Sequence, residues 1–380
     1  MSDRFYRPTF VNVNLDAIGQ NYKSISKLHP QKTAIVVIKA DGYGLGAVNI
    51  AKYLMAQGAE FFAVATMDEA IELRMHGVKA KILVLGVVEP MHIRQASRHR
   101  LALTAPSAEW IMRAAQYLDE ADKSVWLHVK VDTGMGRIGI RDKSEYEEAV
   151  ARIGEVEQFI FEGVYTHFSV ADEVNDATEA MYHRFLTIIQ DNKPEYIHCQ
   201  NSAAALRYGC SECNAFRLGL SLYGYYPSEF IQSVSKVKLI PAMQLVSTVC
   251  FVKQIEPGDT VSYGRTYIAA ESEFVATFPI GYADGLPRMM QGYHINLNGV
   301  QVPIVGRICM DQMMVRVPSN TSIGMQAIII DNKHDSNQSL ESAASKLNTI
   351  TYEVLTSIGR RLPKRYYLNE DVEVYNELMK

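Results

Sequence analysis

The sequence predicts an α/β protein, with an N-terminal (β/α)8 barrel of the TIM type over residues 1–240 and a mostly β domain over residues 241–380. Through the first 220 residues, short apolar runs rich in β-branched residues alternate with longer amphipathic stretches. After about residue 240 the pattern changes to short strands separated by Gly, Pro and Asp turns. A chain of 380 residues is also too long for one ordinary core, so two domains are expected.

Apolar runs mark the expected strands of the barrel. They lie at 33–38, 61–65, 82–85, 101–104, 125–131, 159–166, 196–200 and 216–220. The intervening segments carry apolar residues at helical spacing, as in AVNIAKYLMAQGAE, where Gly58 is placed to end a helix. Strands that alternate with helices favour a parallel sheet, and eight such units favour a closed barrel over an open, doubly wound sheet.

The second domain is expected to be mostly β. Its strand-like segments are LVSTVCFVKQI, VATFPIGY, VPIVGRICM and AIIID, and the helical pattern is confined to SLESAASKLNTITYEVLTSIG. We expect that roughly the first ten residues can pack with this domain rather than with the barrel.

Composition and charge exclude several classes of function. The chain is 48% hydrophobic and 21% charged, with a net charge of -4 and both signs interspersed, so nucleic-acid binding is not expected. It contains no apolar run long enough to span a bilayer. The start, MSDRFYRPTF, lacks the basic and apolar regions of a secretory signal, and a cytoplasmic location is the default expectation.

Cysteine usage favours reduced thiols over a metal site. The five cysteines include a single C-x-x-C, Cys210 and Cys213, with no second pair and no nearby H-x-x-H. Structural zinc needs four ligands, so no metal is expected.

The ends of the predicted barrel strands carry the residues that suggest chemistry. In such barrels the functional side chains follow the C-terminal ends of strands and face one mouth. Lys39 ends the first run, in VVIKADGYGLG. A desolvated lysine there has a lowered pKa and attacks an aldehyde, although a lone strand-end lysine more often points into solvent. The glycine-rich GYGLG is by itself weak evidence of phosphate binding.

Later strand ends strengthen this interpretation because they converge on the same mouth. Phosphate groups are often held after strands seven and eight of such barrels, by backbone N–H groups. Ser202 in QNSAA and Gly219 and Leu220 in FRLGLSLYG fall at that position. The other polar residues at strand ends are Lys130 and Arg137 in KVDTGMGRIG, His167 in YTHFSVADE, and Arg217 in FRLGLSLYG.

Together these motifs resemble those of the alanine racemase family of fold-type III pyridoxal-phosphate enzymes, from about residue 5 to 370. The later segments VSYGRTY, PIGYADG, VGRICMDQ and TITYEVLTSIGRRLPKRY match in order. One departure is the cofactor loop, where ADGYGLG stands in place of the common ANAYGHG, so Asp41 and Leu45 replace Asn and His.

The resemblance implies a role for each site residue. Lys39 would carry pyridoxal 5'-phosphate as a Schiff base, and Tyr263 would be the second catalytic base, with His167 between it and Arg217. The phosphate would be held by Tyr43, Ser202, Gly219, Leu220 and Tyr352. Arg217 would face the pyridine nitrogen, and Arg137 would face the phenolic oxygen and also contact the substrate. Met310 would bind the substrate carboxylate, Tyr282 would narrow the entrance, and Lys130 would be a candidate for carbamylation.

The implied activity is interconversion of L-alanine and D-alanine by two bases on opposite faces, supplying D-alanine for peptidoglycan. Because Lys39 and Tyr263 lie in different predicted domains, the resemblance implies a head-to-tail homodimer with shared active sites.

Three alternatives stay open at this stage. A serine or broad-specificity racemase of the same fold differs only in pocket volume, and one methylene discriminates weakly. A non-catalytic pyridoxal-phosphate carrier would lack the second domain and its tyrosine. The D-T-G at residues 132–134 is typical of aspartic proteases, but those need a second such carboxylate, and the flanking pattern is wrong.

Overall fold

The computed structural model describes residues 6–369 and 371–379. Within them the chain forms two compact units that are not contiguous in sequence. The β unit comprises the described residues up to Ile18, the short segment Tyr43–Gly46, and the described residues from Ile240 onward. The barrel unit comprises Gly19–Gly42 and Ala47–Leu239.

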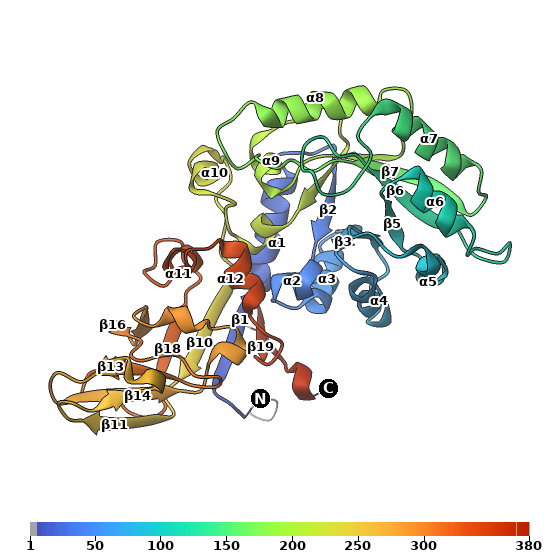
Figure 1. Cartoon of the computed structure of the whole chain (residues 1–380). Helices are drawn as coiled ribbons and strands as arrows, with labels where there is room; N and C mark the ends of the chain where they lie inside the picture. Colours follow the sequence, from blue (N-terminus) through green and yellow to red (C-terminus); the bar gives the residue numbers. More distant parts are fainter. Residues whose placement is uncertain (1–5, 370, 380) are drawn as a thin grey trace. The chain divides into compact units, whose positions relative to one another are not determined.

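The barrel unit contains a closed barrel of eight parallel strands, which confirms the predicted fold (Figure 1). Closure comes from β2 pairing with β9, with Thr33 opposite Ala215. The strands are β2 Thr33–Val37, β3 Phe61–Val64, β4 Lys81–Val84, β5 Ala102–Ala105, β6 Val125–Lys130, β7 Phe159–Tyr165, β8 Tyr196–His198 and β9 Ala215–Leu218.

Helices follow the barrel strands, as the amphipathic spacing predicts. They are α3 Ala47–Ala56, α4 Met67–Met75, α5 Ile93–His99, α6 Ala108–Ala115, α7 Lys143–Gly154, α8 Ala177–Ile189, α9 Ser202–Arg207 and α10 Glu229–Val234. Local signals fix their ends. Gly58 adopts a φ of 93° just after α3, and α4 begins with a capping box between Thr66 and Glu69. Helix α1 (Leu15–Ser26) contains the division between the two units.

The β unit is built from short strands in three sheets, with a seven-stranded sheet in the order β16-β15-β18-β10-β1-β19-β20. Its strands are β1 Thr9–Asn14, β10 Met243–Thr248, β11 Phe251–Ile255, β12 Thr260–Val261, β13 Tyr267–Ile268, β14 Glu273–Phe278, β15 His294–Leu297, β16 Val300–Pro303, β17 Met313–Val317, β18 Gln326–Ile330, β19 Lys364–Leu368 and β20 Asp371–Tyr375. The mostly β prediction for this part of the chain is confirmed.

Two segments of the β unit are divided more finely than their patterns indicate. LVSTVCFVKQI forms two strands, β10 and β11, in different sheets. The helical segment forms α11 (Leu340–Leu347) and α12 (Thr351–Ser357), because Asn348 takes a left-handed φ of 53° between them.

Strand β1 is an interior strand of the seven-stranded sheet, although it is the first strand of the chain. It pairs antiparallel with β10 and parallel with β19, with Val11 opposite Leu245 and Lys364. The alternation in TFVNVN, with its valines buried, supplied the signal for a strand, but its partners lie more than 200 residues away.

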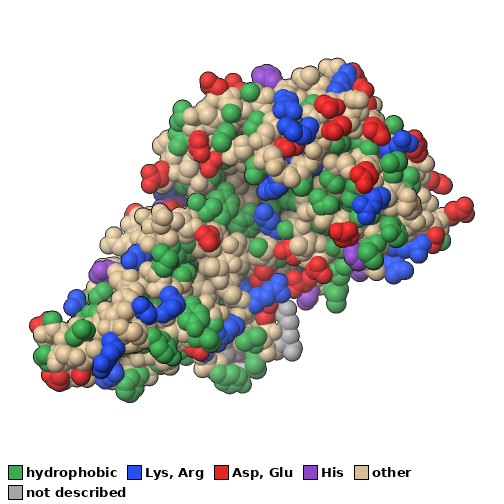
Figure 2. Space-filling model, in the orientation of Figure 1, with side chains coloured by type: hydrophobic (Ala, Val, Ile, Leu, Met, Phe, Trp, Pro, Cys, Tyr) green, Lys and Arg blue, Asp and Glu red, His purple; other side chains and the backbone are tan. Residues whose placement is uncertain are grey.

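Surface charge follows the interspersed pattern of the sequence. In Figure 2 Lys and Arg alternate with Asp and Glu over the visible face. Among the described residues, no helix combines the length and apolar character needed to cross a membrane.

One glycine inside the barrel gives a stability prediction. A Cβ at Gly163 in β7 would overlap the buried ring of His128 in β6, so Gly163→Ala should lower the free energy of unfolding by about 1–3 kcal/mol. Urea unfolding monitored by circular dichroism measures the change.

The matched control is Gly154→Ala in the last turn of α7, where an added Cβ meets no atom within 4 Å. This substitution should leave stability unchanged or raise it by up to about 1 kcal/mol. Equal effects of the two substitutions would contradict the packing argument.

Candidate active site

Lys39 follows β2 after one residue, Ile38, and opens an unusual turn. Ala40, Asp41, Gly42 and Tyr43 all have φ between 52° and 61°, so the chain makes a short left-handed helical turn after the lysine. Left-handed backbone costs roughly 1–2 kcal/mol for each non-glycine residue. Such strain is found at functional sites that the surrounding structure holds in place.

Side-chain hydrogen bonds hold the barrel-unit part of this turn. The Glu69 carboxylate accepts the Ala40 N–H at 2.6 Å and the Ala65 N–H at 2.7 Å, which ties the ends of β2 and β3 together. The Asp41 carboxylate accepts the N–H of Ala47 at 3.0 Å, at the start of α3. Asp41, one of the departures from the common motif, therefore serves as a backbone acceptor.

The Lys39 amine lies in a half-buried, cationic environment. Burial lowers its pKa, and the positive charges of Arg137 and Arg217 lower it further, while Glu69 opposes them. A lowered pKa leaves more of the amine neutral near physiological pH, as a nucleophile or proton acceptor needs.

Arg217 in β9 is a buried guanidinium with hydrogen bonds from both Nη atoms. Nη1 donates to His198 Nδ1 at 2.7 Å, and Nη2 donates to the Thr166 carbonyl at 2.8 Å, the Cys199 carbonyl at 3.1 Å and His167 Nδ1 at 3.2 Å. No hydrogen bond from its Nε to another described residue is present. The side chain is thus fixed in direction.

A buried polar chain continues from Arg217 through the barrel interior. His198 Nε2 lies 3.0 Å from His128 Nδ1, and His128 Nε2 lies 3.0 Å from Glu162 Oε2. The other oxygen of Glu162 accepts from Lys81 Nζ at 2.7 Å. Because arginine only donates, His198 Nδ1 must accept, and each histidine is then assigned the tautomer with its proton on Nε2.

The electrostatics agree with neutral histidines in this chain. Burial lowers the pKa of both His198 and His128, and the nearby Arg217 charge adds to the effect at His198. Burial opposes ionisation of Glu162, but hydrogen bonds from His128 and Lys81 outweigh it and leave the carboxyl pKa below its usual value. The hydrogen-bond chain therefore runs from the Arg217 guanidinium to the Glu162 carboxylate through the neutral rings of His198 and His128.

His167 accepts from Arg217 through Nδ1, so its proton also belongs on Nε2. Burial lowers its pKa strongly, and the charges of Arg217 and Arg137 lower it further. A neutral His167 can thus donate one hydrogen bond through Nε2.

Lys130 is the last residue of β6, and Arg137 lies in the loop that follows. Asp132 accepts the N–H groups of Gly134 and Gly136 at 3.1 and 3.0 Å, which folds the loop tightly. Lys130 is buried, and its Nζ donates to the Val131 carbonyl at 2.7 Å. Burial and then the Arg217 charge lower its pKa to about 8. The Arg137 side chain remains exposed.

The predicted phosphate-binding residues of the barrel unit lie together. Ser202 begins α9, and its Oγ accepts the N–H of Gly219 at 3.0 Å. Gly219 immediately precedes the 3-10 turn Leu220–Tyr223, so backbone donors and a hydroxyl share one corner after β8 and β9. This is where barrels of this type commonly bind phosphate.

Tyr43 and Tyr352, also predicted to bind phosphate, meet inside the β unit. Their ring centroids are 6.3 Å apart, and Tyr43 is fully buried. Gly44 follows with a φ of 81°, and a Cβ there would approach the Leu355 carbonyl of α12 to 2.7 Å. The glycine thus permits close packing of the segment Tyr43–Gly46 on α12.

Three predicted residues of the β unit lie on one set of bonded loops. The N–H of Tyr282 donates to the Cys309 carbonyl, and the N–H of Ala283 donates to the Met310 carbonyl, both at 3.0 Å. Ser262, next to Tyr263, bonds to the Arg307 carbonyl of the same loop. The side chains of Tyr263, Tyr282 and Met310 are 69%, 42% and 52% exposed.

The comparisons with known proteins decide the family. The sequence-family model for the alanine racemase N-terminal domain matches residues 13–227, and the family model for the alanine racemase C-terminal domain matches residues 242–366. The chain belongs to the alanine racemase family. It is 72% identical to an alanine racemase of Macrococcus caseolyticus over 380 residues, and 55% identical to one of Staphylococcus epidermidis over 382 residues; each alignment covers both proteins completely.

Alanine racemases also share the fold over the full chain. The crystal structure of the Bacillus anthracis alanine racemase with bound L-Ala-P has a TM-score of 0.94 and 38% identity, covering 98% of this chain and 99% of that one. The family resemblance proposed from separated motifs is thereby confirmed.

Sequence reasoning missed the buried polar residues that surround Arg217 and the turn after Lys39. His128, Glu162 and His198 lie within strand runs treated as core, and Glu69 lies in an amphipathic helix. A usable signal existed, because imidazole or carboxylate groups inside otherwise apolar strands must find buried partners.

The C-x-x-C cysteines gather with a third thiol. Cys199 and Cys213 are buried, with their Sγ atoms 3.3 Å apart, and all five cysteines are free. Among the described residues, no group of three or more His, Cys, Asp or Glu side chains could hold a metal ion.

The buried neutral histidines predict a pH dependence of stability. Their folded-state pKa values lie below the ordinary value of about 6.5, so below that pH the unfolded chain binds protons that the folded chain does not. The free energy of unfolding should therefore fall as pH falls through about 6.5, and be retained above it.

Urea unfolding at several pH values between about 8 and 5 measures this slope. His198→Gln should make it shallower, whereas His183→Gln, an exposed control, should not. An unchanged slope in His198→Gln would show that this ring does not carry the effect.

Proposed function

We propose that this chain interconverts L-alanine and D-alanine, with pyridoxal 5'-phosphate as cofactor and with Lys39 and Tyr263 as its two bases. The observation that carries the proposal is the Lys39 amine, half-buried beside two arginines with a lowered pKa, in a chain of this family. The D-alanine produced would supply peptidoglycan synthesis.

The described residues fit this cofactor. Lys39 offers an amine that can bind its aldehyde, and Ser202, Gly219 and Leu220 offer a hydroxyl and backbone donors for its phosphate, a task we also assign to Tyr43 and Tyr352. We assign Arg137 to the phenolic oxygen. When bound, pyridoxal phosphate withdraws electrons from the substrate Cα and so acidifies its proton.

Arg217 would hold the ring nitrogen. Its Nε makes no hydrogen bond to a described residue, while its Nη atoms are occupied, so we assign Nε to that nitrogen. Arginine keeps its proton at ordinary pH, so the ring nitrogen would accept a hydrogen bond and stay unprotonated. Electron withdrawal is then weaker, which disfavours side reactions.

Racemisation requires one base to remove the Cα proton and another to return a proton on the opposite face. We assign Lys39 to the D-alanine proton and Tyr263 to the L-alanine proton. The neutral His167, with a proton available on Nε2, is suited to donate to a tyrosine oxygen and so favour its deprotonated form. The Met310 N–H would bind the substrate carboxylate, and Tyr282 would narrow the entrance.

We further propose that a second copy of the chain completes each site. Tyr263, Tyr282 and Met310 present exposed side chains on bonded loops of the β unit, although their proposed roles require contact with substrate. Exposed large side chains gathered on one surface mark interaction sites, and a two-fold dimer would complete two sites at once.

Activity assays test the function and the sharing of sites together. Wild-type protein should racemise alanine, and Lys39→Ala and Tyr263→Ala should each lose about 100-fold or more, because each removes a proton-transfer group. Mixed under conditions of subunit exchange, the two variants should recover up to about a quarter of wild-type activity, since half the dimers are hybrids with one intact site.

The control is each variant subjected alone to the same exchange. An inactive wild type loaded with pyridoxal phosphate would overturn the function. No recovery, with hybrid dimers demonstrated by differential tagging, would overturn the sharing of sites while leaving the function intact.

Lys130 is proposed to be carbamylated. Its pKa of about 8 leaves a neutral fraction at physiological pH, and its nitrogen can attack the carbon of CO2, forming an N–C bond and releasing one proton to water. The product is an anion in place of a cation beside Arg217 and Arg137, whose charges already disfavour the lysine cation.

NMR with isotope-labelled bicarbonate tests this proposal. Wild-type protein should show a carbamate signal that Lys130→Ala lacks and that the exposed-lysine control Lys123→Ala retains. Lys130→Ala should also lose about tenfold or more activity, with partial rescue by acetate. A wild type with no carbamate signal would contradict the proposal.

A further inference from the structure

A cationic cavity lies in the barrel unit, at the far end of the polar chain that starts at Arg217, and Lys81 and Glu162 of that chain line it. Its volume is about 600 Å³, within the range of small-molecule sites. Its lining comes from the end of α4 and the loop after it, the end of α5, and the starts of β4 and β5. Lys81 and Ala102 are the first residues of their strands, so the cavity is at the N-terminal end of the barrel, whereas Lys39 and Ser202 follow strand C-termini.

The cavity carries more positive charge than its carboxylate can balance. Glu162 is the one acidic residue of the lining, and its two oxygens are already used by Lys81 and His128. Lys79 and Arg100 have no hydrogen bond or ion pair from their side chains among the described residues.

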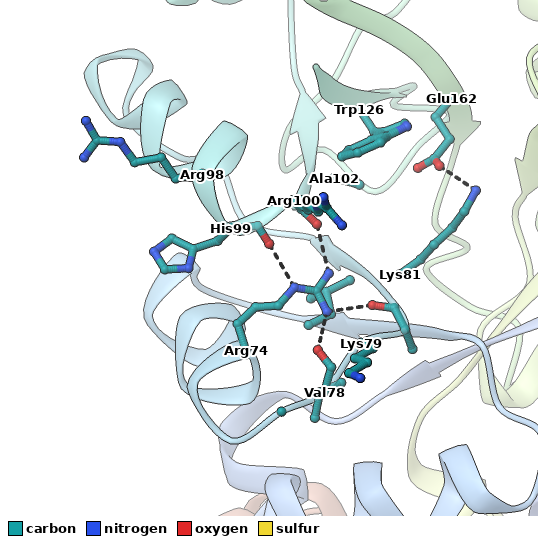
Figure 3. Close-up of a pocket in the computed structure, with 13 residues that line it drawn as sticks. Arg74, Val78, Lys79, Lys81, Arg98, His99, Arg100, Ala102, Trp126 and Glu162 are labelled. Atoms are coloured by element: carbon teal, nitrogen blue, oxygen red, sulfur yellow. Dashed lines mark hydrogen bonds and ion pairs between the residues drawn. The ribbon is translucent and has the colours of Figure 1, made fainter. Parts of the chain in front are cut away.

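Arg74 adds a third uncompensated charge. Its guanidinium donates to backbone carbonyls of Val78, Ala80, His99 and Arg100 at 2.6 to 2.9 Å, and to no carboxylate (Figure 3). Burial lowers its pKa, and the positive charge of Arg100, whose backbone carbonyl Arg74 also contacts, lowers it further. Lys79 and Arg100 are exposed to solvent, so their charged groups are free to pair with an anion that enters the cavity.

The remaining lining is apolar and includes one aromatic side chain. Ile82, Ala102 and Val78 are buried in it, and Trp126 of β6 is partly exposed to it. Figure 3 shows Arg98 and His99 directed away from Lys81 and Trp126, so we leave them out of the site. A flat aromatic ring can stack on an indole while an attached anionic group reaches nearby cations.

We infer that this cavity binds a nucleoside polyphosphate, with its base on Trp126 and its phosphates at Lys79 and Arg100. The volume exceeds what an inorganic anion needs, the cations lack partners, and the apolar surface suits a base. The inference does not depend on the proposed racemase activity, because none of the residues assigned to cofactor or substrate lines the cavity.

Tryptophan fluorescence gives a direct test, since the chain has two tryptophans. Trp110 is buried, and its Nε1 donates to the Val88 carbonyl at 2.7 Å, so it should not respond. ATP, added to the pyridoxal-phosphate-loaded protein, should quench Trp126 with saturation. Trp126→Phe should abolish the quenching, and calorimetry of the same titration measures affinity without the fluorophore.

Charge variants and ligand fragments separate the two halves of the site. Lys79→Gln and Arg100→Gln should each weaken ATP binding about tenfold or more, whereas the exposed Arg113→Gln on α6 should not. Neither Lys79 nor Arg100 makes a side-chain bond among described residues, so both variants should fold normally. Adenosine and pyrophosphate should each bind at least about tenfold more weakly than ATP.

Three outcomes would overturn the inference. One is an absence of saturable binding by both methods. Another is binding that survives the double substitution of Lys79 and Arg100. The third is a fragment that binds as tightly as ATP. Pyrophosphate binding that tightly would show that the base plays no part, and adenosine binding that tightly would show that the phosphates play no part.

Discussion

The buried guanidinium of Arg217 constrains the barrel interior more than any other group. A charge taken out of water needs hydrogen-bond partners, and two histidine nitrogens and three backbone carbonyls accept from the two Nη atoms of Arg217. Because arginine only donates, these contacts dictate which nitrogen of His198 and His167 carries a proton. Because Arg217 can only donate, it sets the direction of each hydrogen bond in the series that ends at Glu162 and Lys81.

The same positive charge shapes the chemistry of its neighbours. Lys39, Lys130 and His167 are all pushed toward their neutral forms by burial and by nearby arginines. For His167 this leaves one proton to donate, and for the two lysines it leaves a nucleophilic nitrogen. The left-handed turn after Lys39, held by Glu69, sets where that nitrogen stands.

Much of this could be predicted from the sequence. Eight apolar runs with helical segments between them gave the barrel, because burial on both sides makes parallel strands continuously apolar. The strand-end motifs named Lys39 and Arg217, since barrels gather function at one mouth. Short β segments between turns gave the second unit, although the place of β1 inside its sheet depends on partners far away in sequence.

The sequence by itself determined the elements and the residues after each strand, because periodicity and turn chemistry are local properties. Only the tertiary structure decided what those residues do to one another. Groups from different strands decide which ring nitrogen of His198 carries the proton. They also decide how far the pKa of Lys130 is lowered. Likewise, no local pattern singles out Arg74, Lys79 and Arg100, and only the fold brings them to one cavity whose carboxylate already bonds Lys81 and His128. Hydrogen bonds and Coulomb forces act over a few ångströms in space, and separation along the chain does not fix that distance.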